Sequence, residues 1–212
     1  MRRASVIVCV IAAVVWAGAE SSSPGGARDA DDALGVQDTS QFRTGDLLFV
    51  RGTSWQSRIV LFLDGYIEDY GSHFSHVGMV WRRNGRAYVI HASPKSLLGV
   101  QDDGSVRLEP LRQFLSAAHI SRAALYRVGV EDPRTAERAA TMAREYVNRA
   151  LPYDRVFDAS TPGALYCTEL VWRAYRAAGL RVPATFSARA HYPLLPSALS
   201  RSPLVTQIDR FP

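Results

Sequence analysis

The sequence predicts an α+β fold in which an antiparallel sheet packs against helices. Two apolar runs, 77–81 and 87–92, flank Asn84-Gly85, the dipeptide that most strongly indicates a two-residue hairpin turn. Apolar residues then recur at helical spacing after Pro133 and again from Cys167 onward. Neighbouring strands, with helices set apart from them along the chain, are typical of this class.

The globular part is expected to form one domain over residues 41–212. Its first element is an apolar strand at 46–50, after a turn at Thr44-Gly45. Apolar and aromatic residues within 54–63 indicate a short helix, and the apolar run 124–128 indicates a further strand. The chain length is sufficient for a single hydrophobic core.

Two longer helices are predicted in the second half of the chain. Pro133 suits the first position of a helix of about four turns, because proline has no N–H to leave unpaired there. The second helix runs from Cys167 to Ala178, and Gly179 ends it. The apolar residues of the first helix recur at Ala136, Ala139, Ala140, Ala143, Tyr146 and Val147.

Residues 1–19 are predicted to be a signal peptide. Arg2 and Arg3 precede an apolar run, 4–16, and the small residues 17–19 form a cleavage site ending at Ala19. The alternative is a membrane anchor, but the run is shorter than the roughly 20 residues that span a bilayer. The sequence therefore predicts a periplasmic or secreted protein, with membrane contact only through an uncleaved signal.

The composition is that of a soluble domain behind a polar linker. Residues 20–40 are rich in Gly, Ser and Asp and are expected to be disordered. Without Arg2 and Arg3, 23 basic residues face 20 acidic ones, a net charge of +3. The arginines are scattered rather than clustered among aromatic residues, which argues against nucleic-acid binding. A short signal and a set of basic residues dominated by arginine favour a bacterial source.

The hairpin register follows from its turn. A two-residue loop at Asn84-Gly85 pairs residues whose numbers sum to 169, and side chains alternate between the faces of a strand. One face should carry six bulky apolar side chains that pack on helices. These are Val77, Met79, Trp81, Tyr88, Ile90 and Ala92.

The other face of the hairpin carries two histidines. His91 lies opposite Gly78, and His76 is its diagonal neighbour, about 7–8 Å away at Cα. Gly78 leaves room for both imidazoles. On the face away from the core, this arrangement favours a catalytic pair, although exposed histidines without a function are the alternative. A loop of odd length would reverse the parity.

Cys167 is the lone cysteine left once the signal that holds Cys9 is removed. It begins a helix, where the backbone dipoles are expected to lower the thiol pKa and where free N–H groups can stabilise an oxyanion. The alternative is a small buried hydrophobic residue. A zinc site with His73, His76 and Cys167 as ligands is a further alternative, but residues three apart on a strand point to opposite faces, so the two histidines would not converge. The sequence thus predicts no metal and no organic cofactor.

Three segments together resemble a known family. The run 76–92 (HVGMVWRRNGRAYVIHA) resembles the histidine hairpin of NlpC-type papain-like hydrolases, and GDLLFV at 45–50 resembles the strand before it. YCTELVWRAY at 166–175 resembles the nucleophile helix. Because the cysteine helix follows the histidines, the order is similar to the circularly permuted YiiX/YaeF-like amidases, which are related to lecithin–retinol-acyltransferase-like enzymes. Pro152-Tyr153-Asp154 is also similar to that branch.

The resemblance implies a permuted papain-like fold and a role for each matching residue. Cys167 would be the nucleophile, His76 the general base and His91 the residue that orients His76. This third position is often Glu in the permuted amidases, so His91 leaves the substrate class open. Tyr166, Asp46 and Tyr153 are candidates for substrate or oxyanion contacts, given on weaker grounds. The backbone N–H of Cys167 is the preferred oxyanion donor.

The expected activity is that of a cysteine-dependent amidase or peptidase, a thiol hydrolase. It would cleave an amide bond in a cell-envelope peptide or N-acyl substrate through an acyl-enzyme on Cys167. The alternative is a lipid acyltransferase or ester hydrolase of the lecithin–retinol-acyltransferase-like type, and a non-catalytic binding module is a third possibility. The expected partner is a peptide, amide or lipid-like small substrate. The sequence does not predict the oligomeric state.

Overall fold

The computed structural model describes most of the chain after residue 38. The described residues are 39–54, 57–58, 60–61, 73–94, 104–116, 119–161, 163–183 and 193–211. The predicted signal peptide and nearly all of the predicted linker lie outside them. Within the helix expected over 54–63, the described residues at 57–58 and 60–61 are helical.

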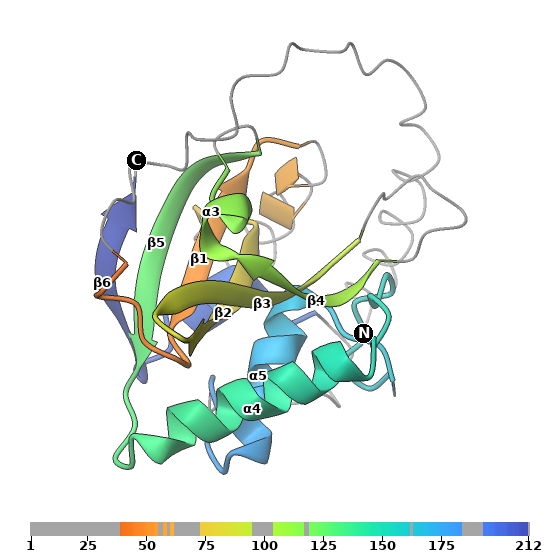
Figure 1. Ribbon diagram of the computed structural model, residues 1–212. Coiled ribbons are helices and arrows are strands. Elements are labelled where there is room, and N and C mark those ends of the chain that lie inside the picture. Colours follow the sequence, from red (N-terminus) through yellow and green to blue (C-terminus); the bar gives the residue numbers. More distant parts are fainter. Residues whose placement is uncertain are drawn as a thin grey trace.

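The described residues form one antiparallel sheet with helices against it (Figure 1). The sheet has six strands in the order β4-β3-β2-β1-β5-β6, and each neighbouring pair runs antiparallel. The strands are β1 (Leu47–Gly52), β2 (His76–Arg83), β3 (Arg86–Ser93), β4 (Ser105–Pro110), β5 (Ile120–Val128) and β6 (Val205–Phe211). The helices are α3 (Leu111–Phe114), α4 (Arg134–Asn148), α5 (Cys167–Ala177) and α6 (Pro196–Ser200).

The hairpin prediction is confirmed. Strands β2 and β3 pair with Met79 opposite Ile90 and Trp81 opposite Tyr88, the register expected from a two-residue loop. Asn84 and Gly85 have φ angles of 51° and 74°, and a type I′ hairpin turn requires a positive φ at both central residues. The turn therefore sets the face on which every side chain of the hairpin lies.

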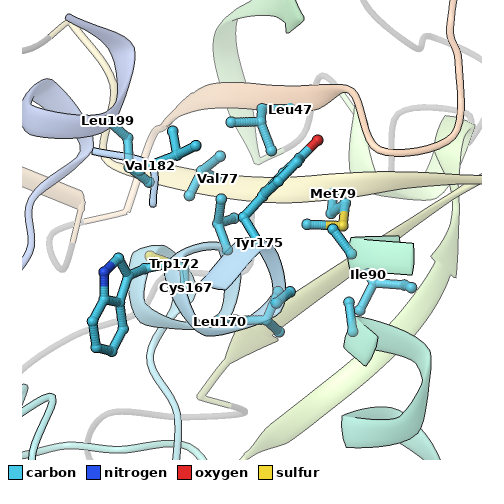
Figure 2. Packing of buried hydrophobic residues seen from close by; sticks show 14 of the residues in the cluster. Leu47, Val77, Met79, Ile90, Cys167, Leu170, Trp172, Tyr175, Val182 and Leu199 are labelled. Atoms are coloured by element: carbon cyan, nitrogen blue, oxygen red, sulfur yellow. The ribbon is translucent and has the colours of Figure 1, made fainter. Parts of the chain in front are cut away.

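One face of the sheet packs on α4 and α5, as the apolar pattern predicted. Val77, Met79 and Ile90 are fully buried there, in a core shared with both helices. Figure 2 shows Leu170 and Tyr175 of α5 against these strand residues. Burial of this face stabilises the fold by about 25 cal/mol for each Å² of apolar surface removed from water.

The opposite face is also buried, which corrects the expectation that the histidines lie on a face away from the core. Val80 and Val89 belong to a second apolar cluster, together with Leu111 and Phe114 of α3. The cover comes from the short helix α3 and from aromatic residues near the ends of the described chain, including Phe42. The sheet is thus covered on both sides, and the histidines lie in a low-dielectric environment.

Helix termini agree with the local sequence signals. Pro133 directly precedes α4, where its missing N–H leaves no bond unmade. Helix α5 starts at Cys167, and Gly179 follows its end with a φ of 91°, a conformation that favours glycine.

The elements β4, α3, α6 and β6 were not predicted. Among the described residues, no helix is both long and apolar enough to cross a membrane.

Candidate active site

The two histidines of the hairpin face each other at hydrogen-bond distance. Nε2 of His76 lies 3.0 Å from Nδ1 of His91, and the ring planes are nearly perpendicular, at 80°. His76 begins β2 and His91 lies near the end of β3, so the antiparallel pairing brings them together. The pairing that the sequence predicted for these two side chains is confirmed.

The histidine pair continues into a carboxylate on the edge strand. Oε2 of Glu109 lies 3.3 Å from Nε2 of His91, and Oε1 of Glu109 lies 2.8 Å from Nε of Arg107. Both residues belong to β4, where His91 pairs with Arg107. Sequence reasoning missed them because the strand itself was not predicted. The alternation of polar and apolar residues in SVRLEP was the available signal.

The surroundings of the histidines disfavour their charged forms. His91 is 3% exposed, and the ring of Phe114 lies 4.9 Å from that of His91 and 5.8 Å from that of His76. Burial lowers the pKa of both histidines, in His76 to well below its ordinary value. Glu109 opposes this effect at His91 through a hydrogen bond and its charge. At neutral pH both imidazoles are therefore neutral and able to act as bases.

Cys167 lies at the first position of α5 and packs against β2. Its side chain is 8% exposed and belongs to the same core as Val77 (Figure 2). The backbone N–H of Val77 acts on the thiol as a hydrogen-bond donor, as do those of Thr168 and Cys167 itself. Val77 directly follows His76, so the thiol lies against the backbone next to His76, whose ring contacts Phe114 of α3.

The pKa prediction for this thiol was wrong in direction. The backbone N–H groups at the helix start do lower the pKa of Cys167, but desolvation is the larger effect and raises it to about 11. A buried thiolate loses the hydration that stabilises it in water. The resting thiol is therefore protonated and is not a preformed thiolate.

Tyr153 comes close to the thiol, whereas Tyr166 is already engaged. Burial raises the pKa of Tyr153 well above its ordinary value, and negative charge on Cys167 acts in the same direction, so its hydroxyl keeps its proton. The backbone N–H of Tyr166 donates to Oε2 of Glu169 at 3.4 Å, and its hydroxyl accepts from the N–H of Leu194 at 2.9 Å. The N–H of Tyr166 is thus committed to Glu169 and its hydroxyl oxygen to Leu194, which favours Tyr153 as the hydroxyl donor.

Asp46 lies away from the histidine pair. It precedes β1, and its backbone carbonyl accepts from the N–H of Val80, four residues along β2 from His76. That offset corresponds to about 13 Å along a strand. The Asp46 carboxylate binds Arg127 through both oxygens, each at 2.8 Å. The structure thus does not bring Asp46 together with Cys167.

No group of three or more His, Cys, Asp or Glu side chains among the described residues could hold a metal ion. The chemically active groups near the sheet are instead the thiol, the two imidazoles and the carboxylate of Glu109. These are the kinds of group that can serve as a nucleophile, a base and a hydrogen-bonded support for that base. This combination suits acyl transfer through a thiol.

Comparison with known proteins agrees with this arrangement. The crystal structure of the metalloprotein yiiX from Escherichia coli O157:H7 is similar, with 25% sequence identity and a TM-score of 0.59. The likeness covers 80% of this chain and 97% of that chain. No curated protein matches. The model of the permuted papain-like amidase enzymes, YaeF/YiiX, C92 family, matches residues 41–193, and the chain therefore belongs to this family, as its sequence motifs indicated.

Proposed function

We propose that this protein is an exported cysteine hydrolase that cleaves an amide bond through an acyl-enzyme on Cys167. The observation that carries the proposal is the position of the thiol against the backbone N–H of Val77, the residue that follows His76 in β2. The hydrogen-bond distance between His76 and His91 supports it, because a base held by a second residue is the arrangement that thiol hydrolases need.

In the proposed reaction, His76 takes the proton of Cys167 as the sulfur attacks the substrate carbonyl carbon. The C–S bond forms, the C–N bond breaks, and the departing amine receives the proton from His76. Water then gives a proton to His76 and attacks the thioester carbonyl, releasing the acid and the thiol. A neutral His76 in the resting state is required for the first step, and its lowered pKa meets this requirement.

The negative charge that develops on the carbonyl oxygen needs donors close to the thiol. The backbone N–H of Cys167 lies at the open end of α5, where helix N–H groups have no partner within the helix. The hydroxyl of Tyr153 is a second candidate because it stays protonated beside the thiol. Tyr166 does not supply its N–H, which donates to Glu169.

The proposed substrate is an amide in the cell envelope, either a peptide or an N-acyl compound. Membership in a family of permuted papain-like amidases supports the amide bond. The arginine pair and the apolar run in residues 1–19 support export to the compartment where such substrates occur. Amino-terminal sequencing of the mature protein from a cell-envelope fraction tests this part, with Glu20 as the expected first residue.

The activity is tested on a panel of N-acyl amides and envelope peptides, with release of free amines as the readout. We expect turnover by the protein and none by Cys167→Ala at equal folded concentration. A parallel series of p-nitrophenyl esters of increasing chain length tests the acyltransferase or esterase alternative. A rate that rises with chain length, without amide turnover, would favour that alternative and contradict the proposal.

A further inference from the structure

The protonation states of the two histidines follow from Glu109. A carboxylate only accepts hydrogen bonds, and the pKa of Glu109 is lowered, chiefly by its hydrogen bond to His91, so this group is ionised at neutral pH. Oε2 of Glu109 lies 3.3 Å from Nε2 of His91, so Nε2 must carry the proton of a neutral His91. Nδ1 of His91 is then unprotonated and accepts.

The tautomer of His76 follows in the same way from that of His91. Nε2 of His76 lies 3.0 Å from the accepting Nδ1 of His91, so the proton of neutral His76 resides on Nε2 as well. Nδ1 of His76 is then the unprotonated ring nitrogen. We propose that Glu109 is a positioning residue that selects, through His91, the ring nitrogen of His76 that acts as base.

Arg107 completes the arrangement. Its Nε lies 2.8 Å from Oε1 of Glu109 and 3.4 Å from Nε2 of His91. The two contacts compete, because an Nε2 that donates to Glu109 cannot also accept from Arg107. The shorter contact joins two opposite charges and is the stronger one. Arg107 therefore holds the carboxylate in place, and Glu109 in turn orients His91.

This inference deepens the proposed function and rests on it for the role of His76 as base. The chain His76–His91–Glu109 connects three neighbouring strands, β2, β3 and β4. Among the described residues, the titratable and charged groups in contact with His91 are His76 on β2, and Arg107 and Glu109 on β4, while His119 also acts on Glu109 through its charge. A change at Glu109 is thus transmitted along a defined series of hydrogen bonds.

The tautomers can be measured directly by long-range ¹H–¹⁵N NMR on protein labelled at histidine, above the titration range of the imidazoles. The chain has five histidines. The variants His76→Gln and His91→Gln assign the signals of these two residues, because each variant lacks one set. We expect protonated Nε2 and unprotonated Nδ1 in both His76 and His91. In Glu109→Leu we expect His91 to lose this preference. A protonated Nδ1 in wild-type His91, or unchanged tautomers in Glu109→Leu, would overturn the inference.

A kinetic readout separates positioning from folding. Glu109→Gln removes the charge that stabilises protonated His91, so the acid limb of the kcat/KM profile should move to lower pH while the plateau falls about 10- to 100-fold. Glu109→Asp should restore the position of the limb. The matched control is Asp209→Asn, on the opposite edge strand β6, where Asp209 accepts from Gln41. Asp209→Asn should change neither the acid limb nor the plateau. A lower plateau in Glu109→Gln without a shift of its acid limb would contradict the inference.

The two proposals fail in different ways. If the tautomers are as stated but Cys167→Ala retains full amide hydrolysis, the proposed function is wrong, and the role of Glu109 in supporting a base falls with it. If hydrolysis depends on Cys167 but His91 carries its proton on Nδ1, the inference about Glu109 alone is wrong. The NMR measurement requires folded protein and no substrate, so it is decisive in either case.

Discussion

Gly78 lies so close to His91 that a β-carbon at Gly78 would come 3.3 Å from Cβ of His91. The same β-carbon would come 2.3 Å from Cγ1 of Val89 and 3.2 Å from the carbonyl oxygen of Ile90. Real β-carbons essentially never approach other atoms as closely as the 2.3 Å contact with Val89. The glycine therefore creates the space in which β3 can present His91 to His76.

Gly78→Ala is accordingly expected to destabilise the protein and to disturb the histidine pair. Overpacking of this kind costs about 1–3 kcal/mol in the free energy of unfolding, which chemical denaturation measures. The kcat/KM per folded molecule should also fall, because His91 must move. Gly129→Ala is the control, since among the described residues its β-carbon would meet just the carbonyl oxygen of Leu204, at 3.6 Å. Equal losses of stability in both variants would contradict the argument.

Cys167→Ala should abolish amide hydrolysis and leave the fold intact. Removal of the nucleophile lowers kcat by at least about a thousandfold in enzymes of this type. The side chain is small and 8% exposed, so its truncation should cost no more than about 1 kcal/mol of stability. Turnover and unfolding are measured on the same preparation. Retained turnover in folded protein would exclude Cys167 as the nucleophile.

The rate of alkylation of Cys167 by iodoacetamide should rise steadily with pH through and beyond pH 9. Burial raises the pKa of the thiol to about 11, so the thiolate fraction keeps increasing tenfold for each pH unit below that value. Mass spectrometry of the labelled protein gives the rate. A plateau that extends from acid to neutral pH would instead demonstrate a preformed thiolate–imidazolium pair.

Glu169 should make stability fall as the pH rises. This carboxyl is fully buried, and desolvation raises its pKa from 4.5 to about 7, against the opposing effect of Arg173 at 2.7 Å. The folded state therefore binds the proton more tightly than the unfolded state. The resulting stabilisation is complete below pH 4.5 and is lost as the pH rises through about 7.

Comparison with Glu169→Gln isolates this effect. The free energy of unfolding of the wild type, minus that of the variant, should decrease by about 1–3 kcal/mol between pH 4.5 and pH 7.5. Both histidines act in the opposite sense, because their lowered pKa values make stability fall on acidification, but they are common to both proteins. A difference that stays constant over this range would show that Glu169 is ionised throughout.

Asp46→Asn is expected to weaken the fold but not the chemistry. Its carboxylate is 3% exposed and binds both Nε and Nη2 of Arg127, so the substitution leaves a charged partner without its counterion. Loss of such a buried pairing costs about 3–5 kcal/mol at most. Thermal unfolding should shift down, while kcat/KM per folded molecule stays within about twofold. A loss of kcat/KM without a loss of stability would indicate that Asp46 does contribute to the substrate site.

Local sequence signals were sufficient for several parts of the fold. The Asn84-Gly85 turn determines the register of β2 and β3, because the side-chain period of a strand is two and the turn has two residues. The start of α5 at Cys167 and its end before Gly179 were readable for the same local reason. The edge strand β4 was not, although its polar and apolar residues alternate, because one short alternating run is a weak signal.

The candidate site shows the same division. His76 and His91 could be placed together from the hairpin alone, whereas Glu109 reaches His91 from a strand that pairs across an intervening segment of the chain. Tyr153 could be proposed from a motif, but its proximity to the thiol depends on the backbone hydrogen bonds that Leu165 makes with Pro152 and Asp154. Asp46 resembled a site residue in sequence and proved to be about 13 Å along the strand from His76.

By itself, then, the sequence determined the hairpin, the face shared by the histidines, and the helix that begins at Cys167. Each of these depends on residues a few positions apart. Only the tertiary structure decided the protonation of the thiol, the carboxylate behind His91 and the burial of both faces of the sheet. The physical reason is that desolvation and long-range hydrogen bonds depend on what other elements pack against a residue, and that packing is not a local property of the sequence.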